Sequence, residues 1–137
     1  MSYISISYNG NKIFVNPNWM HEIMYLIVRE LESDSTIIEK YNLYSVTEDY
    51  KVYYSVPGDV FENPTSFDEI FEHTPSLHEV FSSILEKIRN KLMTDENYCT
   101  FEDLTKNVDI GLVYSSNEVD IEGLIEKIID VETLLKK

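Results

Sequence analysis

Residues 3–15 read YISISYNGNKIFV. Polar and apolar side chains alternate from Tyr3 to Tyr8, which is the period of a β-strand with one covered face. Asn9-Gly10 then supplies the residue pair that type I′ turns prefer, because both central positions of that turn require a positive φ. Lys12–Val15 returns as the second strand. These residues therefore predict a β-hairpin at the start of the sequence.

Three longer segments space their apolar residues as amphipathic helices do. The first begins at Asn16-Pro17, where asparagine suits the N-cap and proline the first helical position, and ends near Ser33. The second covers residues 76–93 and opens with a Ser76–Glu79 capping box, and the third begins at Asp120 as N-cap. We expect the first helix to pack on the hairpin. The apolar stripes are Trp19, Met20, Ile23, Met24, Ile27 and Leu31; Leu77, Val80, Phe81, Ile84, Leu85, Ile88 and Leu92; and Ile121, Leu124, Ile125, Ile128, Val131 and Leu135.

Shorter elements are predicted between these helices. Thr36–Tyr41 makes a further short turn, and a second capping box, Ser66 with Glu69, opens a short helix to about Glu72. Thr100–Lys106 forms another short helix with Thr100 as its cap.

Two further segments predict β-structure. Leu43–Val46 and Tyr50–Val56 are rich in β-branched and aromatic residues, and Thr47-Glu48-Asp49 between them is placed to close a second hairpin. Val108–Tyr114 reads as a late strand. The expected fold class is therefore α+β, with a mainly antiparallel sheet of two hairpins plus a late strand packed against three amphipathic helices. Residues 1–137 have the size of a single domain with its own core.

Charge is the strongest indication of function. The sequence has 25 acidic and 11 basic residues, for a net charge of -14, and residues 52–86 contain no Lys or Arg. Such a charge repels nucleic acid and anionic membranes, but it speeds association with a basic protein. We therefore expect a basic protein partner, with no direct contact to nucleic acid or membrane.

The expected location is cytoplasmic. The first residues have neither the basic nor the apolar region of a secretion signal, and no apolar run approaches the ~20 residues of a membrane helix. A single cysteine, Cys99, excludes an intramolecular disulfide.

Candidate contact residues lie in the acidic segment and in a cluster of tyrosines just before it. Tyr53 and Tyr54 would point to opposite faces of a strand, so at least one of them should lie outside the core. Exposed tyrosine beside carboxylates is typical of a protein interface. The alternatives are that the acids form a solvated face and that the tyrosines fill β positions. The predicted partner-binding residues are Tyr53, Tyr54, Asp59, Glu62, Asp68, Glu69 and Glu72.

Catalytic and metal-binding patterns are weak in this sequence. Glu69, His73 and His78 offer ligand types that suit zinc or iron, but Thr74-Pro75 interrupts the helix between them, which favours surface histidines at a helix boundary. His21 beside Glu22 is a weaker candidate. Neighbouring acids would raise the pKa of Cys99, so a buried, inert thiol is expected. No phosphate-binding glycine pattern is present. We therefore expect neither an enzyme nor a bound metal or cofactor.

In size, acidity and lack of catalytic residues, the chain resembles the small immunity proteins that bacteria carry against secreted toxins. That resemblance is one of general character and extends over the whole chain. It implies an antitoxin that inhibits a cognate toxin, for instance by covering the phosphate-binding cleft of a nuclease domain. Two alternatives stay open: a phage or plasmid DNA mimic that blocks a nucleic-acid-binding protein, and a small metal-dependent enzyme. Oligomeric state is left undetermined.

Overall fold

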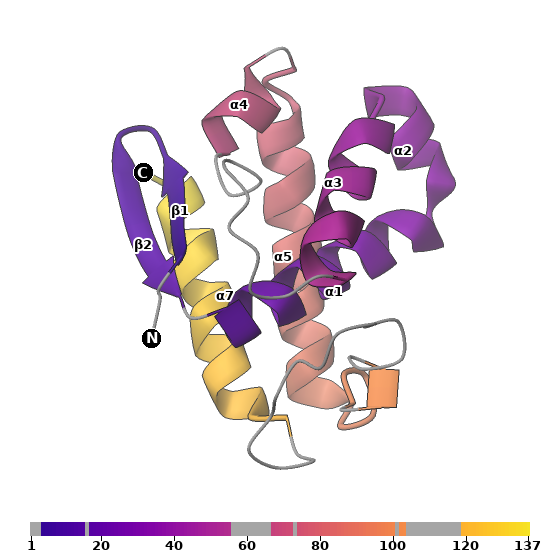
Figure 1. Cartoon of the computed structure of the whole chain (residues 1–137), viewed down its shortest axis with the longest axis vertical. Coiled ribbons are helices and arrows are strands. Elements are labelled where there is room, and N and C mark those ends of the chain that lie inside the picture. The colour runs from indigo at the N-terminus through magenta and orange to yellow at the C-terminus, as the bar shows by residue number, and fades with distance from the viewer. Residues whose placement is uncertain (1–3, 16, 56–66, 73, 101, 104–118) are drawn as a thin grey trace.

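The computed structural model describes residues 4–15, 17–55, 67–72, 74–100, 102–103 and 119–137. Helices α5 and α7 run side by side, α1 crosses both, the hairpin lies beside α7, and α2 and α3 lie on the opposite side (Figure 1). The elements in this part of the chain are β1 (Ile4–Tyr8), β2 (Asn11–Val15), α1 (Pro17–Ser33), α2 (Ser35–Tyr41), α3 (Tyr44–Ser55), α4 (Phe67–Phe71), α5 (Leu77–Thr94) and α7 (Ile121–Leu135).

The predicted first hairpin is confirmed. Asn9 and Gly10 have φ values of 52° and 79°, as a type I′ turn requires, and Tyr8 pairs with Asn11 across the two-residue loop. Ile6 and Val15 are buried on one face, whereas Phe14 on the other is 61% exposed. The expected contact with α1 is present, because Ile6 lies beside Met20 and Ile23, but the hairpin packs chiefly on α7 and α4.

The predicted second hairpin is wrong, because Tyr44–Ser55 forms helix α3. Leu43, Thr47 and Tyr50 are buried, and their spacing of four and three residues is the period of a helix face. The Thr47 hydroxyl donates to the Leu43 carbonyl at 2.8 Å, so this β-branched residue satisfies its polar atom within the helical turn. Helix α3 packs against α1, and this burial overrides the β-propensity of its residues.

The sheet of the described residues accordingly has two antiparallel strands, β1 and β2. The predicted late strand Val108–Tyr114 lies outside the described residues. The fold is thus a mixture of α and β structure in which helices predominate: the described ranges hold six helices, of which α2 and α3 were not predicted as helices.

The three predicted amphipathic helices are confirmed as α1, α5 and α7, and the Asp120 cap accepts a hydrogen bond from the Gly123 amide at 3.0 Å. The predicted capping box at Ser76 does not form. Ser76 has helical φ and ψ of -64° and -16°, and a turn in which the Leu77 amide donates to Thr74 at 2.9 Å precedes the helix. A residue in this conformation does not direct its side chain back to the next amides.

The short elements also follow the prediction in part. Helix α2 begins after Asp34, whose carboxylate accepts from the Thr36 amide, and α4 covers most of the predicted 66–72 segment. The Asp103 amide donates to the Thr100 hydroxyl at 3.1 Å, as expected for a cap, although residues 104–106 lie outside the described residues.

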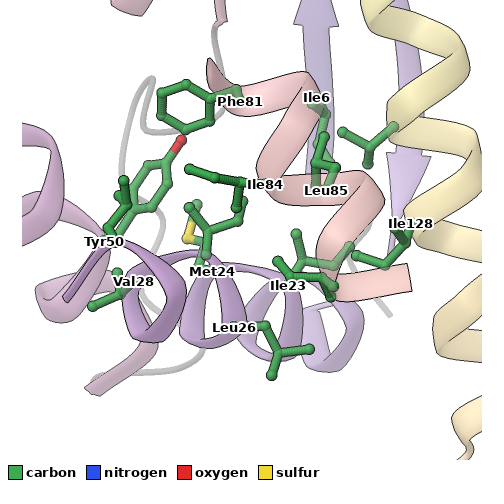
Figure 2. Packing of buried hydrophobic residues seen from close by; sticks show 14 of the residues in the cluster. Ile6, Ile23, Met24, Leu26, Val28, Tyr50, Phe81, Ile84, Leu85 and Ile128 are labelled. Carbon is green, nitrogen blue, oxygen red and sulfur yellow. The ribbon is translucent and has the colours of Figure 1, made fainter. Parts of the chain in front are cut away.

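The core forms where α1, α5 and α7 meet the hairpin. Helix α1 is buried along most of its length, and Figure 2 shows its Ile23 and Met24 facing Ile84 and Leu85 of α5. Ile6 of β1 and Ile128 of α7 belong to the same cluster. Burial of this apolar surface is the main stabilising term, at roughly 25 cal/mol per Å².

A substitution at Gly123 tests this packing. Alanine usually stabilises a helix relative to glycine by about 1 kcal/mol. A Cβ at position 123 would lie 2.6 Å from Oδ2 of the Asp120 cap and 2.7 Å from Cη2 of Trp19, so we expect Gly123→Ala to lower the free energy of unfolding by about 1–3 kcal/mol instead. Urea unfolding measures the change, with exposed Thr133→Ala in the same helix as control. A stabilised Gly123→Ala protein would show that the Trp19 ring does not restrict this helix.

Candidate partner-binding surface

Helix α4 presents its acidic residues to solvent because its aromatic residues anchor it. Phe67 and Phe71 are buried, and their ring centroids lie 5.9 and 5.5 Å from that of Phe81 in α5. The opposite side of this short segment is exposed, as is Glu79 in the first turn of α5. We call this set the acidic face; it consists of Asp68, Glu69, Glu72 and Glu79.

Asp68 also has a structural role that the sequence did not indicate. Both of its carboxylate oxygens accept from the Asn9 amide, at 3.0 and 3.1 Å, and the Asn9 side-chain amide donates to the Lys137 carbonyl at 3.0 Å. These three residues, which we call the turn junction, hold the hairpin turn to α4 and to the end of α7. Asp68 is therefore exposed, but its carboxylate is held by the hairpin turn and is not free to turn toward a binding partner.

The other predicted contact residues are only partly placed. Asp59 and Glu62 lie outside the described residues, and Tyr53 and Tyr54 belong to α3, with side chains that are likewise undescribed. The strand argument that put these two tyrosines on opposite faces is wrong, because neighbours on a helix are about 100° apart. The structure thus places exposed acids on α4 and on the first turn of α5, two helices that are in contact.

The other tyrosines of the predicted cluster, those with described side chains, differ in how far they are buried. Tyr50 is buried, Tyr41 is half-buried with the Lys40 ammonium 5.3 Å from its ring centroid, and Tyr44 at the start of α3 is 55% exposed. Tyr44 is therefore a candidate aromatic contact that the sequence reasoning missed. A helical assignment of 44–55 would have shown that it lies outside the Leu43, Thr47 and Tyr50 face.

Several basic residues pair with carboxylates within the fold. Arg89 bonds Glu132 at 2.7 Å, Arg29 lies 3.7 Å from Asp103, and Lys127 lies 3.6 Å from Asp130. The two lysines of α5 converge on Glu30. Apart from the Lys127 pair, which lies within α7, these contacts join different elements, whereas Lys12, Lys136 and Lys137 are exposed near the turn junction.

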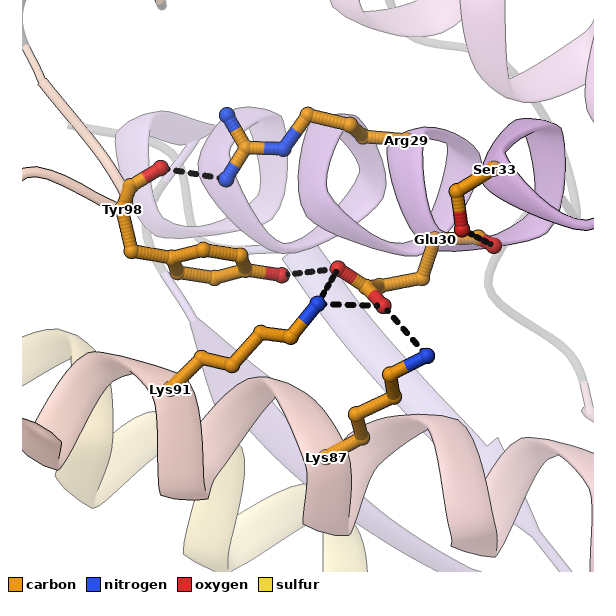
Figure 3. Close-up of polar contacts among 6 residues, drawn as sticks. All are labelled: Arg29, Glu30, Ser33, Lys87, Lys91 and Tyr98. Atoms are coloured by element: carbon orange, nitrogen blue, oxygen red, sulfur yellow. Dashed lines mark hydrogen bonds and ion pairs between the residues drawn. The ribbon is translucent and has the colours of Figure 1, made fainter. Parts of the chain in front are cut away.

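Glu30 is the centre of a polar network between α1 and α5. Its side chain is only 4% exposed, and Lys91 Nζ approaches its two oxygens at 3.1 and 3.2 Å, with Lys87 Nζ at 3.3 Å. The Tyr98 hydroxyl donates to the same carboxylate at 2.6 Å (Figure 3). We call these four residues the Glu30 network.

The network explains the ionisation of its members. Burial by itself would raise the pKa of the Glu30 carboxyl, but the hydrogen bonds from Tyr98 and Lys91 outweigh that effect and leave the pKa below its usual value. Burial and the bond to Glu30 raise the pKa of Tyr98. The Tyr98 ring also lies under the Arg29 guanidinium, 4.3 Å from its centroid, and Arg29 donates to the Tyr98 carbonyl. One feature of the sequence indicates this site: Glu30 continues the helical spacing of the apolar residues Ile23 and Ile27, which places an acid on the buried face of α1.

The histidines and Cys99 do not form a metal site in the described residues, where no group of three or more His, Cys, Asp or Glu residues is arranged to hold an ion. His78 bonds the Leu135 carbonyl and packs against the rings of Tyr8 and Phe71, while His73 lies outside the described residues. Cys99 is buried, as predicted, and burial together with Glu22 raises the pKa of its thiol to about 12. His21 and Glu22 are buried in α1.

Comparison with known proteins gives no family for this chain, since no family model, curated protein or solved structure matches it. Among the described helices, none combines the length and the apolar character needed to cross a membrane.

The Glu30 network yields a prediction about stability and pH. Glu30→Gln keeps the side-chain shape but removes the charge that Lys87 and Lys91 face, and we expect the free energy of unfolding at pH 7 to fall by about 1–3 kcal/mol. The partial exposure of both lysines keeps the loss below that of a fully buried pair.

The sign of the pH dependence follows from the lowered pKa. The contribution of Glu30 is complete above its ordinary pKa of 4.5 and is lost as the pH falls through the lower pKa of the folded state. The difference between wild type and Glu30→Gln should therefore shrink in acid. Urea titrations at pH 7 and at a series of lower pH values measure it, with exposed Glu126→Gln as control. A difference that stayed constant with pH would contradict an ionised Glu30.

Proposed function

We propose that this protein is an immunity protein, an antitoxin that binds and inhibits a basic toxin domain such as a nuclease. The observation that carries the proposal is the distribution of charge. The basic residues of α5 are paired with Glu30 and Glu132 of neighbouring helices, although both lysines stay partly exposed, whereas the acidic face is directed to solvent without such pairing to α5. The resemblance in size and acidity to immunity proteins supports the same proposal.

The proposed mechanism uses the acidic face in two steps. Its carboxylates first attract the basic partner over a distance set by the Debye length, about 8 Å at physiological ionic strength. In the complex they then occupy the places where the partner would hold phosphate groups. Phe67 and Phe71 support this step, because they fix α4 on Phe81 and so limit the entropy lost on binding.

Aromatic side chains buried in the interface would slow the dissociation of the complex. Tyr44 is exposed at the start of α3 and is the described tyrosine best placed for this role. Tyr53 and Tyr54 stay as predicted anchors, and Asp59 and Glu62 as further predicted contacts. Tyrosine contributes contact area with little loss of side-chain entropy, which is why it is enriched among interface hot spots.

The toxin partner can be identified from the native host. If the protein is an immunity protein, its gene should lie directly after a toxin gene, and pull-down from that host with mass spectrometry should recover the product of the toxin gene. Binding kinetics and inhibition of toxin activity are then measured with this product. Recovery of a DNA-binding protein, with binding abolished by competing duplex DNA, would favour the DNA-mimic alternative instead.

Charge reversal tests the acidic face. Glu69→Lys, Glu72→Lys and Glu79→Lys in one variant should lower the association rate with the recovered toxin by at least about tenfold, because attraction becomes repulsion. The wild-type rate should also fall with added salt. Asp68 is left unchanged because it holds the turn junction.

A control variant separates position from net charge. Glu39→Lys, Glu96→Lys and Glu126→Lys reverse the same number of exposed acids elsewhere on the molecule. We expect this variant to keep most of the wild-type association rate. Equal losses in both variants would mean that net charge, and not the acidic face, governs binding; no loss in either would overturn the proposed surface.

Tyr44→Ala should raise the dissociation rate constant and leave the association rate constant nearly unchanged. Loss of an anchor at a hot spot costs roughly 2 kcal/mol or more, and most of this appears as faster dissociation. Surface plasmon resonance with the recovered toxin measures both rates, and exposed Tyr44 can be truncated with little change in the core. An unchanged dissociation rate would exclude Tyr44 from the interface without affecting the test of the acidic face.

A further inference from the structure

Asn9 combines exposure, a glycine neighbour and a structural role. It is exposed in the hairpin turn with φ of 52°, and Gly10 follows it with φ of 79°. Apart from the two chain neighbours of Gly10, no heavy atom lies within 4 Å of the place where its Cβ would stand. Gly10 therefore has no side chain of its own to shield its backbone nitrogen, and no residue distant in sequence crowds the position of its Cβ.

This arrangement supplies the groups for an intramolecular reaction. The Gly10 nitrogen attacks Cγ of Asn9, the Cγ–Nδ2 bond breaks, and Nδ2 leaves as ammonia with the proton that Gly10 loses. The product is a cyclic succinimide. Water then adds to one of its two carbonyl carbons and opens the ring, which yields either aspartate or isoaspartate. No oxidant, metal or second protein is needed.

The products lose the side-chain contact of Asn9 in the turn junction and weaken its backbone contact. The Asn9 side-chain amide donates to the Lys137 carbonyl at 3.0 Å, and the Asn9 backbone amide faces both oxygens of Asp68 at 3.0 and 3.1 Å. A carboxylate at position 9 has no proton to donate to Lys137 and brings like charge toward Asp68. Isoaspartate also lengthens the backbone inside a two-residue loop, which breaks the pairing of Tyr8 with Asn11.

We propose that Asn9 is a site of spontaneous deamidation and that its conversion releases the hairpin turn from α4 and from the end of α7. The modification adds negative charge beside the acidic face, so it changes the protein at the surface most concerned with recognition. This inference rests on the turn junction alone and does not require the proposed toxin partner.

Asn42 provides an internal control for the reaction. It is exposed and has the same φ of 52°, but the buried side chain of Leu43 follows it where Gly10 follows Asn9. The φ of the asparagine is thus matched, whereas the following nitrogen differs in two ways: Leu43 carries a side chain, and its amide donates to the Ile38 carbonyl at 2.9 Å. A faster reaction at Asn9 than at Asn42 would therefore reflect the nitrogen of the following residue and not a positive φ.

The first experiment measures the reaction in the folded wild-type protein. Purified protein is incubated in mildly alkaline buffer at 37 °C, and peptide mapping by mass spectrometry with chromatographic separation of the isomers follows each asparagine over weeks. We expect Asn9 to convert before Asn42 and to yield both aspartate and isoaspartate. Retention of the Asn9 amide while other asparagines convert would overturn the proposal.

The second experiment measures the consequence without waiting for the reaction. Asn9→Asp should lower the melting temperature by roughly 2–8 °C, the range expected when a small domain loses one such interaction. Asn9→Gly suits the same turn and adds no charge, so its loss should be smaller. Asn90→Asp adds a charge to the exposed side of α5 and should change little. An Asn9→Asp protein as stable as wild type would show that the turn junction does not depend on Asn9.

Discussion

A buried carboxylate sets the constraint on which much of this structure depends. Glu30 lies with His21 and Glu22 among the buried polar residues of α1, where an unpaired charge would cost several kcal/mol. Lys87 and Lys91 of α5 and the hydroxyl of Tyr98 satisfy it, and their contacts fix how α5 and the following turn lie on α1. The acids of α4 face solvent for a separate reason, because two buried phenylalanines anchor the other side of this helix on α5. Helix packing around Glu30 and the proposed recognition surface thus depend on different contacts of α5.

The elements with long or strict periodicity could be predicted from the sequence. Asn9-Gly10 correctly predicted the first hairpin, and the apolar stripes correctly predicted α1, α5 and α7, because a periodic pattern over many residues outweighs the propensities of single residues. The prediction for residues 44–55 was wrong because this segment carries two opposing patterns. Its β-branched and aromatic residues favour a strand, while the spacing of Leu43, Thr47 and Tyr50 favours a helix. Contact with α1 decides between them, and that contact is not visible in a short window.

The candidate site was predictable in composition but not in detail. Exposure of Asp68, Glu69 and Glu72 follows from their charge, and the structure places them on one short segment. The bonds from Asn9 to Asp68 and the convergence on Glu30 join residues distant in sequence, so no local pattern could indicate them. The same holds for His78, whose contacts with Tyr8, Phe71 and Leu135 give it a place in the packing.

The central claim is that a basic partner binds the acidic face while the Glu30 network stays intact. The most direct measurement is an NMR titration of the isotopically labelled protein with the basic partner recovered by pull-down. The account predicts that amide shifts change first at residues 67–72 and at Glu79, and that residues around Glu30 and Tyr98 keep their shifts. Changes confined to α7 or α2, or a partner that leaves residues 67–79 unperturbed, would contradict it.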